Sequence, residues 1–151
     1  MVTLVANPTF LDTNILVYAS IAQAPWHTVA LNAILIREQA GIELWTSRQV
    51  LREYLAALSR PQTFTPPIPI ATLTTEIQAF ENRFKIAEAG PQVTAKLLTL
   101  LNQVTTGGKQ VHDANIVATM QAYDLSYLLT HNTADFSRFA NYITVINLND
   151  A

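Results

Sequence analysis

Short apolar runs with β-strand character alternate along this chain with longer stretches of helical periodicity, and this alternation predicts an α/β fold. Half of the 151 residues are hydrophobic and only 13% are charged, so the chain is richer in core-forming residues than a typical soluble domain. Strands that alternate with helices favour a mainly parallel sheet covered by helices on both faces. We therefore expect a single domain over residues 1–151, built around such a sheet.

Each expected element is bounded by recognisable start or stop residues. The strands are expected at residues 10–11, 44–45, 83–86, 127–130 and 142–148. The helices are expected from about residue 13, over residues 29–40, 50–58 and 74–82, from residue 91 to about 101, and over residues 114–123. Gly41 is typical of a helix C-cap and Pro91 of a first helical turn. Thr46 followed by Gln49 fits a capping box at the start of the third helix.

Two segments are expected to remain outside helices and strands. Four prolines fall between Pro61 and Pro69, a density that excludes a helix, and we interpret this segment as a surface connection inside the domain. The run from Thr105 to Gly108 is a natural loop.

Composition excludes several classes of protein. No apolar run approaches the roughly 18 to 20 residues of a membrane span, and no basic region leads into an apolar signal core, which favours a cytoplasmic protein. The absence of cysteine excludes disulfides and thiolate metal sites. A net charge of −2 argues against a broad nucleic-acid-binding surface, but not against a nuclease whose acids are neutralised by metal.

Four acidic residues stand where a strand or loop gives way to the next element: Asp12, Glu53, Asp113 and Asp135. In a parallel sheet, ligands bind outside the carboxyl ends of the strands. Carboxylates gathered there would bind hard divalent cations such as Mg²⁺ or Mn²⁺, which points towards phosphodiester chemistry.

Taken singly, each acid has a plainer explanation. Asp12 and Asp113 are each suited to be helix N-caps. Glu53 lies just off an apolar stripe and could be a solvated helix residue, and Asp135 could be a loop acid. Spacing alone does not join the four residues into one site.

Four segments of the sequence, taken together, resemble the motifs of one family. They are residues 10–19, which contain Asp12-Thr13-Asn14, residues 46–53, which end in Glu53, residues 108–119, which contain His112-Asp113-Ala114-Asn115, and residues 129–136, which run Leu-Thr-His-Asn-Thr-Ala-Asp-Phe. In this order they resemble the PIN-domain family and, within it, the VapC-type toxins. The resemblance extends from about residue 9 to residue 148.

The resemblance implies a PIN-like three-layer α/β/α sandwich with a mainly parallel central sheet of four to five strands. It also implies an endoribonuclease that depends on Mg²⁺ or Mn²⁺ and cleaves single-stranded or loop RNA by metal-activated water, leaving a 5′-phosphate and a 3′-hydroxyl. Its expected partners are a small cognate antitoxin and a second copy of the chain in a homodimer. An excess of apolar residues is compatible with that dimer.

The implied site contains four metal ligands and two further residues. The ligand roles fall on Asp12, Glu53, Asp113 and Asp135. Many relatives carry an Asp where this chain has Asn132, so we expect Asn132 to shape the site and to hydrogen-bond a water on the ion. Thr13 either places its hydroxyl beside Asp12 or bonds to the backbone at the helix start.

Other polar and aromatic residues near the motifs carry weaker indications. Four basic residues either contact RNA phosphates or serve as solubilising charges: Arg48, Arg52, Lys109 and Arg138. His112 and His131 are expected in supporting or surface roles. Trp26 and Trp45 are expected in the core or an interface rather than as base-stacking platforms.

Three other functions fit the same residues. The chain could be a PIN-domain nuclease of RNA processing or decay without an antitoxin, or a non-catalytic binding module. It could also be a Mg²⁺-dependent phosphatase or DNA nuclease, because acid clusters of this kind serve related phosphoryl chemistry.

Overall fold

The computed structural model describes residues 7–151, and its centre is a five-stranded sheet whose paired strands are all parallel. The strands are β1 (Thr9–Leu11), β2 (Leu44–Ser47), β3 (Lys85–Ala87), β4 (Tyr127–Thr130) and β5 (Thr144–Asn147). They lie in the order β3-β2-β1-β4-β5, so the chain builds outwards in one direction from β1 to β3 and in the other from β4 to β5. The direction changes between β1 and β4, the position at which such sheets bind ligands.

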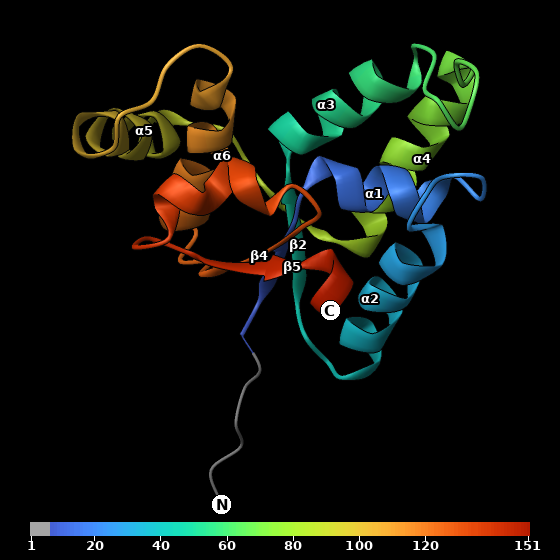
Figure 1. Ribbon diagram of the computed structural model, residues 1–151, viewed down its shortest axis with the longest axis horizontal. Helices are drawn as coiled ribbons and strands as arrows, with labels where there is room; N and C mark the ends of the chain where they lie inside the picture. Colours follow the sequence, from blue (N-terminus) through green and yellow to red (C-terminus); the bar gives the residue numbers. More distant parts are fainter. Residues whose placement is uncertain (1–6) are drawn as a thin grey trace, which may run out of the picture.

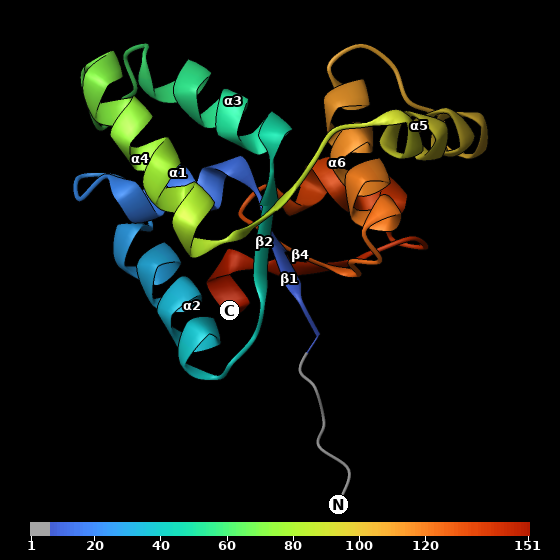
Figure 2. The same ribbon diagram turned by 180° about the vertical axis from the view of Figure 1, so that it is seen from behind.

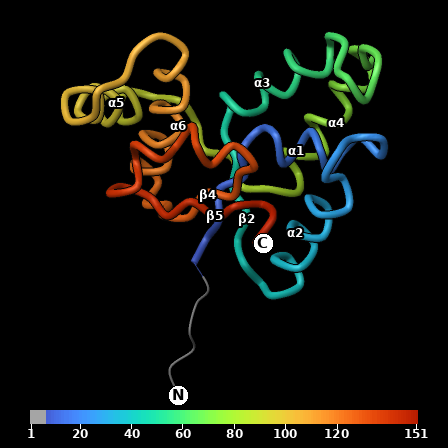
Figure 3. Tube along the Cα trace, in the orientation of Figure 1, coloured from blue at the N-terminus to red at the C-terminus, as the bar shows by residue number. Residues whose placement is uncertain are grey.

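Helices cover both faces of this sheet (Figures 1 and 2). They are α1 (Thr13–Ser20), α2 (His27–Gln39), α3 (Arg48–Leu58), α4 (Ile70–Arg83), α5 (Pro91–Gln103) and α6 (Gln110–Ala122), with short 3-10 helices η1 (Thr133–Phe139) and η2 (Leu148–Asp150). Helices α1 to α4 lie on one side, and the connection from β3 carries the chain across to α5 and α6 on the other (Figure 3). The predicted three-layer sandwich is confirmed, with five strands.

The core fills the space between the strands and both helical layers. Side chains of β1 and β4, including Phe10, Leu11, Leu128 and Leu129, have no exposed surface. The sequences of β1 and β4 are continuous apolar runs because both faces of an interior parallel strand are covered by helices. The two central strands are therefore rigid supports for whatever follows their carboxyl ends.

Several predicted helix boundaries were wrong by one to four residues. Helix α4 begins at Ile70, directly after Pro69, and α6 begins at Gln110 after Lys109, which supplies no side-chain cap. Neither start carries the Ser, Thr, Asp or Asn that marks a helix start. The cap of α3 is Ser47, whose Oγ accepts from Val50 N, while Thr46 stays in β2 and donates to Leu11 O.

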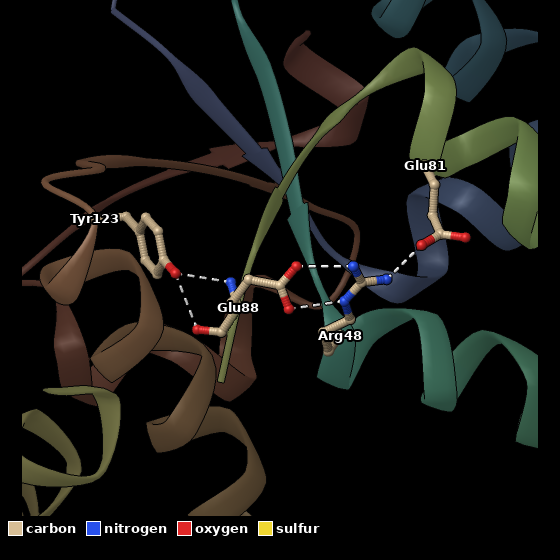
Figure 4. A network of polar contacts seen from close by, with 4 residues as sticks. All are labelled: Arg48, Glu81, Glu88 and Tyr123. Carbon is tan, nitrogen blue, oxygen red and sulfur yellow. Dashed lines mark hydrogen bonds and ion pairs between the residues drawn. The ribbon is translucent and has the colours of Figure 1, made fainter. Parts of the chain in front are cut away.

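The outer strand β3 is tied to its surroundings by a polar network (Figure 4). The guanidinium of Arg48 donates to both carboxylate oxygens of Glu88 at 2.8 and 2.9 Å and to Glu81 at 2.6 Å. The hydroxyl of Tyr123 accepts from Glu88 N and donates to Glu88 O. We call Arg48, Glu81, Glu88 and Tyr123 the Arg48 network, and it joins α3, α4 and α6 across the segment that follows β3.

Two predictions concern the N-terminal end of the chain. The start of the predicted domain and the expected lack of a signal segment fall partly on residues 1–6, outside the described residues. Within residues 7–151, none of the helices combines the length and apolar character needed to cross a membrane.

Candidate functional site

A pocket of about 270 Å³ opens at the carboxyl ends of β1 and β4, on the switch point of the sheet. All six residues of the predicted site line it: Asp12, Thr13, Glu53, Asp113, Asn132 and Asp135. They come from α1, α3, α6 and the segment after β4, four parts of the chain far apart in sequence. The fold therefore brings together what spacing alone did not join.

Asp12 is the most buried of the four acids, with 6% of its surface exposed. Its Oδ1 accepts from Thr13 N at 2.8 Å, so it caps α1, as its plainer explanation required. Its Oδ2 accepts from Thr130 Oγ1 at 2.8 Å and from Asn14 Nδ2 at 3.1 Å. Burial, with a smaller effect of the nearby Glu53 charge, nevertheless raises the pKa of Asp12 to about 6 against these hydrogen bonds. Asp12 is both a helix cap and a pocket acid.

Glu53 is held from two sides within the pocket. Thr13 Oγ1 donates to Glu53 Oε2 at 2.7 Å, and Gln49 Nε2 donates to Oε1 at 3.0 Å. The hydroxyl of Thr13 thus serves the second acid rather than Asp12, which receives only its backbone N–H. Glu53 is half-buried, so the plainer reading of it as a solvated helix residue is wrong.

Asp113 and Asp135 complete the acidic wall without fixed partners. Asp113 lies in the first turn of α6 and is not its N-cap, which corrects one of the alternatives left open by the sequence. Burial raises the pKa of Asp113 to about 6, and the charges of Asp135, Asp12 and Glu53 act in the same direction. Within the described residues, neither the Asp113 nor the Asp135 carboxylate makes a hydrogen bond or an ion pair.

The four carboxylates have the chemistry that a hard divalent cation requires, but the distances between them in this structure are too long to hold one ion. All four side chains offer carboxylate oxygens, the ligands that Mg²⁺ and Mn²⁺ prefer. Burial first, and neighbouring carboxylates second, raise the pKa of Asp12 and of Asp113. In the part of the chain that the structure describes, however, no three acidic or imidazole side chains are close enough together to hold one ion. Asp12 and Glu53 are fixed by hydrogen bonds, so convergence on an ion would require Asp113 and Asp135 to rotate towards them.

Asn132 and two neighbours connect β1, α1 and the segment after β4. The backbone N–H of Asn132 donates to Thr130 Oγ1, which in turn donates to Asp12. Asn14 Oδ1 accepts from His131 N at 2.9 Å. The side chain of Asn132 is exposed at the pocket, where an amide offers oxygen without charge.

The remaining candidates lie in mixed settings. Arg48 belongs to the Arg48 network, so its guanidinium is occupied by carboxylates. Arg138 donates to Thr105 O and Gln110 Oε1, and its charge lowers the pKa of Asp113 in part. Trp26, 43% exposed in a left-handed backbone conformation, is not a core residue.

Sequence reasoning missed several residues of the pocket and its support. Gln49 was interpreted only as a capping partner, yet it bonds Glu53, the backbone oxygen of His112 and the side chain of Asn115. Asn14 belongs to the Asp12-Thr13-Asn14 motif, but its bonds to Asp12, Thr130 and His131 were not predicted. Apolar and aromatic side chains also line the pocket: Val17, Tyr18, Ala57, Phe64 and Ile116. No local signal marked them, since each reads as ordinary core or loop.

Comparisons with known proteins identify the family and the fold. The family model of the PIN domain matches residues 9–142. A search of curated proteins finds no match. Solved structures share the fold at low identity. VapBC2 from Rickettsia felis, bound to a DNA fragment from its promoter, is 22% identical with a TM-score of 0.67, over 92% of this chain and 97% of that one.

Two further structures extend the comparison. A toxin–antitoxin complex from Klebsiella pneumoniae is 19% identical with a TM-score of 0.64, covering 93% of this chain and 97% of the other. VapC20 of Mycobacterium tuberculosis, a toxin that cleaves the sarcin–ricin loop, is 15% identical with a TM-score of 0.62, covering 92% and 98%. At these identities the structures show a shared fold, and the family model, which spans most of the sequence, shows the family. The chain belongs to the PIN-domain family.

Proposed function

We propose that this chain is a Mg²⁺- or Mn²⁺-dependent endoribonuclease, and that it is the toxin of a VapBC-like toxin–antitoxin pair. The observation that carries the proposal is one pocket that four carboxylates line and in which, within residues 7–151, none of them forms an ion pair. Such a group is unfavourable by itself, because burial and neighbouring carboxylates raise the pKa of Asp12 and of Asp113. A divalent cation relieves this repulsion, and family membership makes a nuclease its natural user.

The proposed ligands divide into a fixed pair and a movable pair. Asp12 and Glu53 are the fixed ones, since Thr130, Thr13 and Gln49 restrain their oxygens. Asp113 and Asp135 are the movable ones. When bound, Mg²⁺ or Mn²⁺ supplies charge neutralisation at the phosphodiester and lowers the pKa of water. The protein's own contribution is to bring the four carboxylates and the Asn132 amide into one pocket.

The partner and the cellular setting extend the same proposal. Several structures that share this fold are toxin–antitoxin complexes, which supports a small protein partner for this chain. Such a partner could present a basic side chain to the acids in place of metal. We also propose a homodimer and a cytoplasmic location. Two exposed apolar side chains, Ile36 on α2 and Ile70 on α4, supply surface for contacts of this kind.

The direct test is a nuclease assay on purified protein. A pool of cellular RNA is incubated with Mn²⁺ or with EDTA, and the new ends are sequenced; labelled DNA and a small phosphate ester are assayed in parallel. We expect RNA cuts with 5′-phosphate ends, only with Mn²⁺, and none from Asp113→Asn. Equal cleavage of DNA or of the ester, or cuts that persist in EDTA, would contradict the proposal.

A further inference from the structure

The pocket has a second wall of different chemistry from the acids. Besides the carboxylates, its lining includes apolar and aromatic side chains, namely those of Val17, Tyr18, Ala57 and Phe64. Tyr18 and Phe64 are half-buried, unlike the fully enclosed aromatic residues of the core such as Tyr54. Each therefore keeps part of its surface towards the pocket, and the metal chemistry makes no use of it.

The aromatic wall is held in place by the proline-rich connection between α3 and α4. Gln62 and Thr65 pair their backbones, at 2.9 and 3.4 Å, around a tight turn that carries Phe64. Gln62 Nε2 donates to Ala57 O at 2.7 Å, and Ile68 N donates to Leu58 O at 2.8 Å, so the turn is tied to the end of α3. The connection is thus a built part of the pocket and not merely a surface link.

The two rings contact each other within the lining of the pocket. Tyr18, on α1, meets Phe64 edge to face, with ring centroids 6.3 Å apart and planes inclined by 69°. Tyr18 also meets His131 edge to face, with ring centroids 5.7 Å apart. Edge-to-face pairs of this kind stabilise ring orientation. Tyr18, six positions after Asp12 in the sequence, is therefore oriented by two aromatic neighbours, Phe64 and His131.

We propose that Tyr18 and Phe64 form a stacking subsite for an unpaired nucleobase of the RNA strand, next to the phosphate held at the acids. A base is joined to its phosphate through a single ribose, so a phosphate at the carboxylates brings a base to the remainder of the same small pocket. Aromatic side chains are the usual stacking platforms for unpaired bases. A base inside a duplex has both faces covered, so the subsite selects single-stranded or looped RNA. This inference rests on the proposed nuclease function.

The test compares a base with no base at one position. Two short RNAs contain the same mapped cut site, and one of them carries an abasic residue beside the scissile phosphate. Wild type, Phe64→Ala, Phe64→Trp and the control Leu98→Ala, which truncates an exposed apolar side chain on α5, are assayed on both with Mn²⁺. Binding of a single-stranded RNA and of a base-free ribose phosphate chain of the same length is measured by anisotropy in parallel.

Stacking predicts a loss that depends on the base. Phe64→Ala should lower kcat/KM on the normal RNA by about five- to a hundredfold, mostly through KM, and leave the abasic substrate little changed. Phe64→Trp should restore the wild-type value, and Leu98→Ala should match wild type on both substrates. The anisotropy assay should show the same preference for bases, lost in Phe64→Ala.

Other outcomes would overturn the subsite. Equal losses on both substrates would make Phe64 a packing residue, and no loss on either would remove it from RNA binding. A variant unchanged towards RNA but no longer inhibited by an antitoxin would assign the wall to a protein partner. If wild type cleaves no RNA, the proposed function fails, and the anisotropy preference alone then decides the subsite.

Discussion

Beside β3, Glu81 and Glu88 share the guanidinium of Arg48, whereas at the carboxyl ends of β1 and β4 four acids line one pocket and, in residues 7–151, form no ion pair. The paired Arg48 lowers the pKa of the Glu88 carboxyl. Burial and neighbouring carboxylates raise the pKa of Asp12 and of Asp113 to about 6. The same functional group is thus stabilised as an anion in one region and destabilised in the other. Stability explains the first arrangement, whereas the second is unfavourable by itself and supports the proposed cation site.

The largest expected effect comes from removing the most buried acid. Asp12→Asn should lower metal-dependent RNA cleavage by at least about a hundredfold, a loss comparable to deleting one group that stabilises a transition state. Without metal the same change should raise the free energy of unfolding at neutral pH by about 1–2 kcal/mol, less than the full penalty of the buried charge because the Asn14 amide then faces another amide.

The matched control is Glu88→Gln, which removes a carboxylate charge from the Arg48 network. It should leave cleavage unchanged and lower the melting temperature slightly. Cleavage and calorimetry measure the two effects separately. An Asp12→Asn protein that is as active as wild type would remove Asp12 from the site, and one that is less stable without metal would show that its charge is not under repulsion.

The pH dependence of stability should have opposite signs in the two regions. The folded pKa of Asp12 is about 6 against an ordinary 3.8, so its ionisation weakens the fold. That penalty is absent below about pH 4, grows as the pH rises through 6, and reaches about 3 kcal/mol by pH 7. The lowered pKa of Glu88 acts oppositely, adding stability as the pH rises.

Chemical denaturation of metal-free protein between pH 4 and pH 8 measures the free energy of unfolding, in which the effects of both regions are combined. We expect Asp12→Asn to flatten the fall in stability between about pH 4 and pH 6, and saturating Mn²⁺ to convert that fall into a gain, because metal binds the ionised acids of the folded state alone. A wild-type profile identical with that of Asp12→Asn would contradict the raised pKa.

A smaller effect is expected from the support of Glu53. Thr13→Val removes the hydroxyl that holds Glu53 Oε2 but leaves the contact with Gln49. Loss of such a restraint costs about tenfold or more in metal affinity. Titration of Mn²⁺ monitored by the melting temperature should show this weakening, and Thr13→Ser should restore affinity. Thr99→Val removes an exposed hydroxyl that donates only to Ala95 O within α5, and it serves as the control. Equal Mn²⁺ affinity in Thr13→Val and wild type would make the Thr13 contact incidental.

The sequence predicted one side of this comparison better than the other. The strands and the acids that follow them were predictable, because buried parallel strands are continuous apolar runs and their carboxyl ends share one edge. The starts of α4 and α6 were missed, since Pro69 and Lys109 give no capping signal. The roles of Gln49 and Phe64 depend on which distant segments pack beside them. The partners of Arg48 were unpredictable for the same reason: they lie 33 and 40 residues away.

The smallest effect should come from breaking the Arg48 network itself. Arg48→Met keeps the aliphatic stem but removes the guanidinium, whose side chain is 37% exposed. Exposed ion pairs contribute about 0–1 kcal/mol, so the free energy of unfolding should fall by no more than that, and less in high salt. Cleavage should be unchanged, because Glu81 and Glu88 lie outside the acid pocket. Denaturation in low and high salt, with the nuclease assay, tests both statements. A marked loss of cleavage with unchanged stability would instead place Arg48 on the RNA path, and the contrast between paired structural acids and unpaired functional ones would then not hold.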